Sequence, residues 1–225
     1  MRSWVIAPAR NGEFVANMEK VLDVYKRPYN ENYPVVCMDE CPKQLIEEAQ
    51  PGLGMKPGRT RRVDYEYIRK GVVNLFMANE PLKGSRITEV TTFKKKKDWA
   101  LFIKRIADKE YPKATKITLV MDNLSTHNAS SLYETFKPKE AKRIADRFEF
   151  VYTPKHGSWL NMAEIELHVL NGQCLNRHLS TIEQITDQVT AWTQNRNNKK
   201  SKVNWQFTNS DARIKLKRLY PSIVS

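Results

Sequence analysis

The sequence predicts a mixed α/β domain built around one core. Short apolar runs with the character of buried strands alternate with segments whose apolar residues recur at helical spacing. The order is strand, strand, strand, helix, strand, helix, strand, helix, which indicates a sheet covered by helices. Forty per cent of the 225 residues are apolar, which is enough for a substantial core. No stretch approaches the roughly 18 apolar residues of a membrane span.

The first half of the chain predicts a helix, three strands and a second helix. Apolar residues at helical spacing over 12–26 indicate the first helix, and the apolar run 35–39 indicates a buried strand. Residues 51–62 combine glycines, prolines and four cations, which predicts a mobile basic loop. The next elements are two strands, at 64–79 and 86–93, and a helix with these residues on one face: Trp99, Phe102, Ile103 and Ile106.

The second half alternates strands and helices after Pro112. We predict strands at 117–122 and 148–152, on either side of a helical segment at 129–147. A turn at 154–157 leads into two further helices, and the tail is basic and mostly irregular. The predicted bounds are 161–176 and 181–196 for these helices and 197–225 for the tail.

The charge distribution indicates a polyanionic partner. The formal net charge is +13, with 12 basic and five acidic residues in 51–100 but six basic and eight acidic residues in 1–50. Clustered Lys and Arg bind nucleic acid by releasing counterions from phosphates, although a basic surface can also serve solubility alone. The run of lysines at 94–97 has the simpler interpretation of a solvated helix start.

The cysteines indicate reduced thiols in a cytoplasm, because their number is odd and nothing suggests secretion. A zinc site is the alternative, but the CxxC spacing of structural zinc sites is missing. Its ligands would be Cys37, Cys41, Cys174 and His178.

Three acidic residues are candidates for a shared site. Asp39 and Asp122 each end an apolar run, where a charge is costly to bury unless it meets a cation. Each alone is also explained as a turn former or helix N-cap. Glu164 follows Asn161 by three residues, a capping-box-like pattern that places its carboxylate in the first turn of a helix. Glu166 is the alternative, but it points roughly 200° away around that helix.

Several motifs make the chain resemble a known family. They are Asp39-Glu40, Asp122-Asn123 with His127, Tyr152-Thr153-Pro154, and Asn161 with Glu164. The run 152–164 is the most specific, and residues 204–208 and 211–214 resemble the family's C-terminal end. On these residues, from about residue 12 onward, the chain resembles the DDE transposases of bacterial insertion sequences. The likeness is strongest to the insertion sequence 630 family, a relative of the mariner elements.

The resemblance implies a ribonuclease-H-like fold, with a mixed sheet flanked by helices, and a metal-dependent activity on DNA. Asp39, Asp122 and Glu164 would be the catalytic residues and would bind two Mg²⁺ (or Mn²⁺) ions. The implied reaction is hydrolysis of phosphodiesters at transposon ends, followed by transfer of the freed 3′-hydroxyl into target DNA. A nuclease without strand transfer, or a non-catalytic DNA-binding remnant of a degraded element, are the alternatives.

Further residues would support this site or contact DNA. The supporting residues implied by the motifs are Glu40, Asn123, His127 and Asn161, although a histidine before a helix is also a common cap or surface residue. Trp159 would touch DNA or pack against the helix that it precedes. The expected DNA contacts are the loop cations Lys56, Arg59, Arg61 and Arg62, with Lys155, His156 and Trp159 in the turn before Glu164.

The resemblance also sets expectations for domains and partners. We expect a helical segment or linker at 1–32, the catalytic domain at 33–178, and a C-terminal helix and basic tail at 179–225 packed on it. Met162 departs from the proline of many relatives. Relatives usually begin with helix-turn-helix domains, so we expect a truncated gene, an isolated catalytic domain, or a separate helix-turn-helix polypeptide. Relatives act as homodimers on paired ends, and a bacterial cytoplasmic, nucleoid-associated protein is expected.

Overall fold

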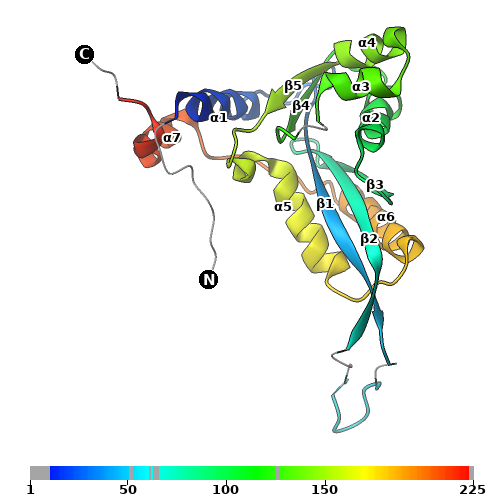
Figure 1. Cartoon of the computed structure of the whole chain (residues 1–225). Helices are drawn as coiled ribbons and strands as arrows, with labels where there is room; N and C mark the ends of the chain where they lie inside the picture. Colours follow the sequence, from blue (N-terminus) through cyan, green and yellow to red (C-terminus); the bar gives the residue numbers. More distant parts are fainter. Residues whose placement is uncertain (1–10, 51–52, 61, 63–65, 125–126, 223–225) are drawn as a thin grey trace.

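A five-stranded mixed sheet forms the centre of the protein (Figure 1). The computed structural model describes residues 11–50, 53–60, 62, 66–124 and 127–222. The strand order is β3-β2-β1-β4-β5; β1, β2 and β3 are antiparallel neighbours, whereas β4 pairs in parallel with both β1 and β5. The bounds are β1 Val35–Glu48, β2 Tyr67–Glu80, β3 Ser85–Thr91, β4 Ile117–Met121 and β5 Phe148–Tyr152.

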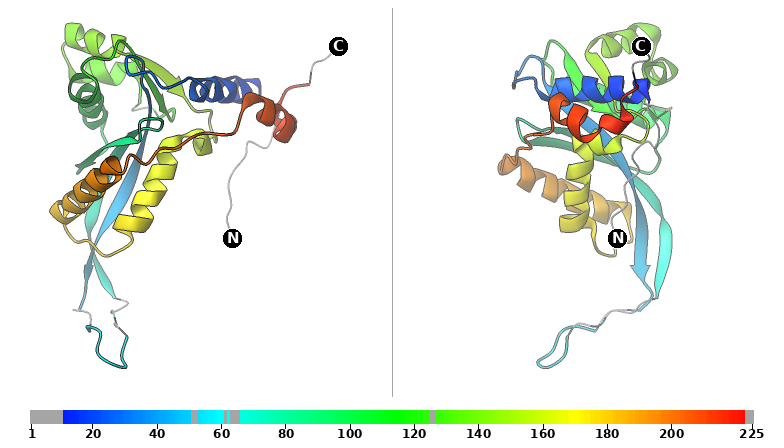
Figure 2. Two further views of the ribbon diagram at one scale, coloured as in Figure 1. Left: turned by 180° about the vertical axis from the view of Figure 1, so that it is seen from behind. Right: turned by 90° about the vertical axis from the view of Figure 1, so that its left-hand side faces the viewer.

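Helices cover both faces of the sheet (Figures 1 and 2). Helices α2, α3 and α4 share one core with the sheet, in which Trp99, Phe76 and Phe102 are among the largest fully buried side chains. Helices α1, α5 and α6 pack on the opposite face, in two further apolar clusters. The bounds are α1 Gly12–Tyr25, α2 Lys96–Arg105, α3 Ala129–Thr135, α4 Pro138–Asp146, α5 Met162–Leu170, α6 Ile182–Asn198 and α7 Asn209–Lys215.

The first strand is longer than its apolar run. We predicted a strand at 35–39, but β1 continues to Glu48 as a ribbon paired with β2, which extends away from the body of the protein (Figure 1). The apolar run marks only the part of the strand that helices cover on both faces. Asp39 therefore lies within a strand, and its prediction as a strand end is wrong.

The basic loop continues this hairpin. Leu53 and Arg62 exchange two backbone hydrogen bonds, at 2.8 and 3.1 Å, and so do Lys56 and Arg59, at 3.2 and 2.8 Å. The side chains of Lys56, Arg59 and Arg62 are exposed at this tip. Arg61 lies outside the described residues. Among the residues that the structure does describe, the predicted loop is thus a paired ribbon that carries its cations outward.

The predicted helix at 129–147 is two helices. Pro138 begins α4, and Lys137 before it has φ −58° and ψ 147°, which is outside the helical region. A proline disfavours helical backbone at the preceding residue and cannot donate to the previous turn, so α3 ends at Thr135. The helix predicted at 161–176 is likewise α5 followed by a π-helical turn at Asn171–Leu175.

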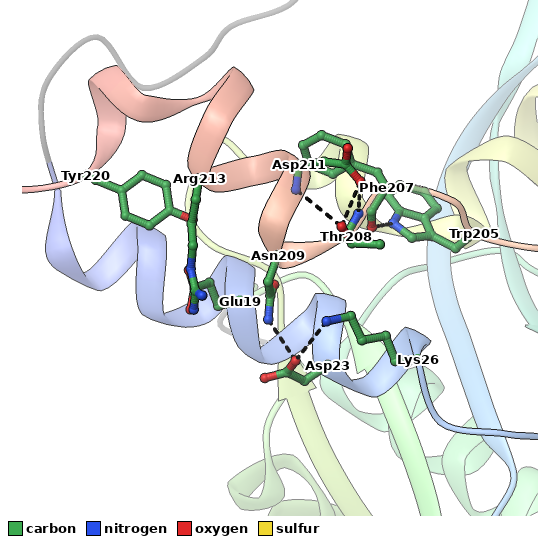
Figure 3. Close-up of polar contacts among 10 residues, drawn as sticks. All are labelled: Glu19, Asp23, Lys26, Trp205, Phe207, Thr208, Asn209, Asp211, Arg213 and Tyr220. Atoms are coloured by element: carbon green, nitrogen blue, oxygen red, sulfur yellow. Dashed lines mark hydrogen bonds and ion pairs between the residues drawn. The ribbon is translucent and has the colours of Figure 1, made fainter.

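The tail is more ordered than predicted (Figure 3). It forms α7 and a short 3-10 helix, Lys217–Leu219, which pack against α1. Asn209 Nδ2 donates to Asp23 Oδ1 at 2.7 Å, and Arg213 forms two 2.9 Å bonds to Glu19. Thr208 and Asp211 form a capping box at the start of α7, and this pattern is present in the sequence. Tertiary contacts thus stabilise a helix too short to form alone.

Candidate active site

The topology brings Asp39 and Asp122 side by side. Strands β1 and β4 are parallel neighbours, with Cys37 opposite Val120. Asp39 and Asp122 each follow these positions by two residues, and side chains two apart share one face of a sheet. Burial raises the pKa of the Asp39 carboxyl to about 7, and the negative charges of Asp122 and Glu164 add to this rise. The three acidic groups therefore converge.

Asn161 fixes the position of Glu164 relative to Asp39. The Asn161 side chain is buried; its Oδ1 accepts from Ala163 N at 3.1 Å and caps α5. Its Nδ2 donates to the carbonyl of Met38 at 2.8 Å, beside Asp39. The start of α5 is thus bonded directly to β1. The reciprocal bond of a capping box, in which the Asn161 N–H would donate to the Glu164 carboxylate, does not form among the described residues; this N–H donates to the carbonyl of Ser158 at 2.7 Å. The Glu164 carboxylate is left available to the aspartates.

Glu166, the alternative third acid, belongs to a separate cluster. It is fully buried and accepts from Arg86 Nε at 2.8 Å and from Arg86 Nη2 at 2.7 Å. Arg196 adds two further bonds, at 3.0 and 3.1 Å. Burial alone would raise the pKa of Glu166, but the hydrogen bonds and charges of the two arginines hold it below its usual range. With its oxygens occupied, Glu166 does not reach the aspartates, and Glu164 remains the predicted third acid.

His127 connects Asp122 to Glu40. The histidine is fully buried and stacks on Trp99, with 5.9 Å between ring centroids. Its Nδ1 donates to Asp122 Oδ1 at 2.5 Å, and its Nε2 lies 3.6 Å from Glu40 Oε2. Burial would lower the pKa of His127, but the contacts with Asp122 and Glu40 raise it to about 9. The interpretation of His127 as a surface residue or cap is therefore wrong; Asn128 caps α3 instead.

The surroundings of His127 include a residue that sequence reasoning missed. Lys94 Nζ pairs with Glu40 Oε1 at 3.1 Å, so one of the predicted solvated lysines neutralises the acid behind the site. A run of four lysines contains no signal that would single it out. Asn123 is exposed and makes no hydrogen bond within the described part of the chain.

The turn before α5 presents the other predicted DNA contacts. Lys155 and His156 are exposed, and His156 has a left-handed backbone, with φ 63°. Trp159 is half-buried, and its ring meets Phe207 edge-on at 6.0 Å. Both interpretations of Trp159 stay open, since its packing leaves part of the ring accessible. The hairpin cations lie far from this turn along β1 and β2 (Figure 1).

The donor set fits a hard divalent cation. Three carboxylates from three elements supply the oxygen ligands that Mg²⁺ and Mn²⁺ prefer, and a cation would offset the burial and the repulsion that raise the pKa of Asp39. The carboxylates approach without closing into a coordination shell. Within the described ranges, no three His, Cys, Asp or Glu side chains are already grouped to hold a metal ion. The alternative zinc ligands are thus not assembled, and all three cysteines are free thiols.

A family comparison identifies the catalytic domain. Residues 34–186 match the model of the family described as DDE superfamily endonuclease. The chain belongs to this family. The match covers more than half of the chain and includes all three converging acids. A search of curated proteins found no match. No helix in the part of the chain that the structure describes is long and apolar enough to cross a membrane.

Solved structures confirm the expected ribonuclease-H-like fold. The chain resembles the Mos1 mariner paired end complex with Mn, with a TM-score of 0.61 and 14% identity over 89% of this chain and 60% of that one. The paired end complex with Mg gives 0.58, with 11% identity over 99% and 67%. The Mos1 strand transfer complex gives 0.55, with 12% identity over 89% and 62%. The chain thus spans about three fifths of the first of these relatives.

Proposed function

We propose that this chain is the catalytic domain of a DNA transposase. It would hydrolyse phosphodiesters at transposon ends and transfer the freed 3′-ends into target DNA. The convergence of Asp39, Asp122 and Glu164 within a DDE superfamily endonuclease carries the proposal. The similar structures are Mos1 paired-end and strand-transfer complexes, which support DNA ends and target DNA as the substrates.

In this proposal the three acids hold two Mg²⁺ or Mn²⁺ ions. Such a pair would activate the attacking oxygen and stabilise the leaving oxygen of an in-line displacement. The protein holds the acids in place: Asn161 bonds the start of α5 to β1, and His127 orients Asp122 from the opposite side. This arrangement reduces the motion needed to bind the ions, which is the usual role of groups behind metal ligands.

The predicted DNA contacts complete the proposed substrate site. Lys155 and His156 stand exposed in the turn that leads to Glu164, and the hairpin presents Lys56, Arg59 and Arg62 to the solvent. Cations spaced along an extended ribbon suit a phosphate backbone, which is recognised by charge and not by base sequence. The homodimer on paired ends, the separate helix-turn-helix polypeptide and the bacterial nucleoid location stay predictions.

The catalytic assignment is tested with Asp122→Asn, with Asp187→Asn as the matched control. Asp187 is an exposed aspartate on α6, remote from the cluster, and removing its charge changes the net charge equally. Strand cleavage of DNA with transposon ends in Mg²⁺ should disappear in Asp122→Asn and persist in Asp187→Asn. Cleavage by Asp122→Asn at the parental rate would contradict the assignment.

Strand transfer separates this function from its alternatives. A nuclease without transfer would cut ends but would not join a pre-cleaved 3′-end to target DNA, whereas a transposase would do both. A non-catalytic remnant would do neither, and would show no Mn²⁺ between Asp39 and Asp122 in soaked crystals. Joining of a pre-cleaved end is therefore the decisive assay.

A further inference from the structure

A basic groove lies at the end of the sheet opposite the candidate active site. Cys37 pairs with Asn79, so the β2–β3 turn at 81–84 lies beyond the beginning of β1. Asp122, in contrast, lies beyond the end of β4, which runs parallel to β1. The tail passes this turn on its way from α6 to α7 (Figure 2), and Val203 N donates to the carbonyl of Pro81 at 3.0 Å.

Two adjoining hollows make up the groove. The first, of about 440 Å³, is lined by Tyr29, Lys83, Lys200 and Lys202, among others. The second, of about 290 Å³, is lined by Lys26, Arg27 and Trp205, among others, and shares Leu82 with the first. Within the described part of the chain, no acidic residue lines either hollow. We call these two hollows together the tail groove.

Two of its lysines are available to a ligand. Lys200 and Lys202 are exposed and form no ion pair with any residue that the structure describes. The other cations have partners: Lys83 lies 3.7 Å from Glu80, Lys26 lies 3.9 Å from Asp23, and Arg27 pairs with Glu149. An excess of positive charge therefore faces the solvent along the tail, without a protein group to balance it.

A buried arginine holds the backbone that carries these lysines. Arg86 is 3% exposed, and its guanidinium donates to the carbonyl of Gly84, at 2.7 Å, and to that of Ser201. Gly84 has φ 76°, and an added Cβ would lie 2.6 Å from the backbone of Lys200, so only glycine allows this approach. These contacts hold the β2–β3 turn against the tail, so the backbone that carries Lys200 and Lys202 has a fixed position.

The charge of the surroundings limits the path of a ligand. A neighbouring hollow, which Lys83 also lines, contains three glutamates, Glu31, Glu80 and Glu110, and one further lysine, Lys113. Because acidic side chains outnumber basic ones there, a polyanion is favoured less in that hollow than along the tail, past Lys200 and Lys202 toward Trp205. Tyr29, half exposed, offers a ring at the edge of this path. A groove lined by lysines and an arginine is suited to the phosphate backbone of nucleic acid.

We infer that the tail groove is a second DNA-binding site, which holds the sugar–phosphate backbone of duplex DNA away from the strand being cut. The choice of DNA as the polyanion rests on the proposed function. The site recognises phosphates through Lys200 and Lys202 and reads no base sequence. Through this site the enzyme binds DNA independently of the candidate catalytic carboxylates.

The experiment compares two charge reversals with the same change in net charge. One variant carries Lys200→Glu and Lys202→Glu, and the control carries Lys137→Glu and Lys139→Glu, two exposed lysines at the start of α4 with the same spacing. Binding to two duplexes of about 30 bp and unrelated sequence is measured by fluorescence anisotropy in EDTA, between roughly 50 and 200 mM salt. Thermal unfolding checks that both variants fold.

The groove variant should bind both duplexes at least about tenfold more weakly at the lower salt, with a salt slope smaller by about two. The control should change little. Equal weakening of the two variants, or full binding by the groove variant, would overturn the second site. Because EDTA removes divalent metal, the binding result is independent of cleavage. If the parent protein failed to cleave DNA in a separate assay with Mg²⁺, that failure would count against the proposed function alone.

Discussion

Two clusters of charge lie along helix α5, and they differ in how their negative charge is balanced. At the start of the helix, Asp39, Asp122 and Glu164 approach each other, with His127 as the cation bonded to one of them. Two residues later, Glu166 is fully buried, yet two arginines satisfy both of its oxygens. The first cluster has too little positive charge to balance its acids, whereas the negative charge of the second is fully balanced.

This difference in charge balance indicates different roles. The first cluster is suited to binding a ligand, and the second connects elements of secondary structure. A buried acid without a counter-charge costs free energy, so its retention indicates a partner outside the chain. The Glu166 cluster connects α5 to β3 and α6, and one member cannot be removed without leaving a buried charge. The first cluster should therefore control activity, and the second should control stability.

The largest effect should follow neutralisation of the catalytic cluster. Asp39→Asn and Glu164→Gln each remove a proposed ligand, and ligation supplies several kcal/mol of transition-state stabilisation. We expect the rate of Mg²⁺-dependent cleavage to fall on the order of 10³-fold in each. Single-turnover cleavage of end-containing DNA measures it, with Glu183→Gln, exposed on α6, as a control that should keep the parental rate.

The opposite result is expected two residues away. Glu166→Gln leaves the buried Arg86 without its charge partner, which should lower the free energy of unfolding by about 3–5 kcal/mol. Glu164→Gln removes a half-buried acid from a cluster of mutually repelling carboxylates, and it should change the free energy of unfolding by less than about 0.5 kcal/mol. Urea unfolding of both variants without metal compares them. Equal losses of stability would show that the two clusters do not differ as argued.

A smaller effect on activity should come from behind the site. His127→Gln keeps a polar group beside Asp122 but loses the bridge toward Glu40. Groups that orient metal ligands typically contribute 10–100-fold to metal affinity or activity, so we expect the Mn²⁺ concentration needed for cleavage to rise by about that factor. His168→Gln, exposed in the last turn of α5, is the control. A shift no larger than that of the control would argue against an orienting role.

Capping residues sharpen the comparison further. Asn161→Ala removes the cap of α5 and its bond to β1, whereas Thr208→Ala removes the cap of α7 in the tail. Each should lower the free energy of unfolding by about 1 kcal/mol, with a larger loss for the buried Asn161. Only Asn161→Ala should also slow cleavage, because only its helix carries Glu164. Urea unfolding and cleavage assays on both variants measure these effects. Equal slowing of cleavage by Asn161→Ala and Thr208→Ala would contradict the prediction.

The smallest expected effect is a pH dependence of stability. The arginines hold the pKa of Glu166 below its usual value of 4.5. Its contribution to stability is therefore fully present above pH 4.5 and is lost as the pH falls through the lower folded-state value. The difference in unfolding free energy between the parent protein and Glu166→Gln should narrow as the pH is lowered from about 5 toward 3. Urea unfolding across this range measures it, and a constant difference would contradict the ion-pair assignment.

Much of the candidate site was visible in the sequence. Asp39 and Asp122 stand out because a charge at the end of an apolar run needs an explanation, and Glu164 because it follows a capping asparagine. The split at Pro138 and the cap at Thr208 were also readable, since proline breaks helices and a capping box starts them.

The sequence by itself determined the order of elements, the acids with their apolar context and the excess of basic residues, because local periodicity and composition carry this information. Only the tertiary structure shows that arginines occupy Glu166, which leaves Glu164 as the candidate third acid. Arg86 reaches Glu166 across 80 positions, and no local pattern contains that contact. The same holds for His127, which lies between Asp122 and Glu40, and for the tail groove, where Lys83 and Lys200 line the same hollow. Their electrostatics arise from neighbours in space, which the chain brings together only by folding.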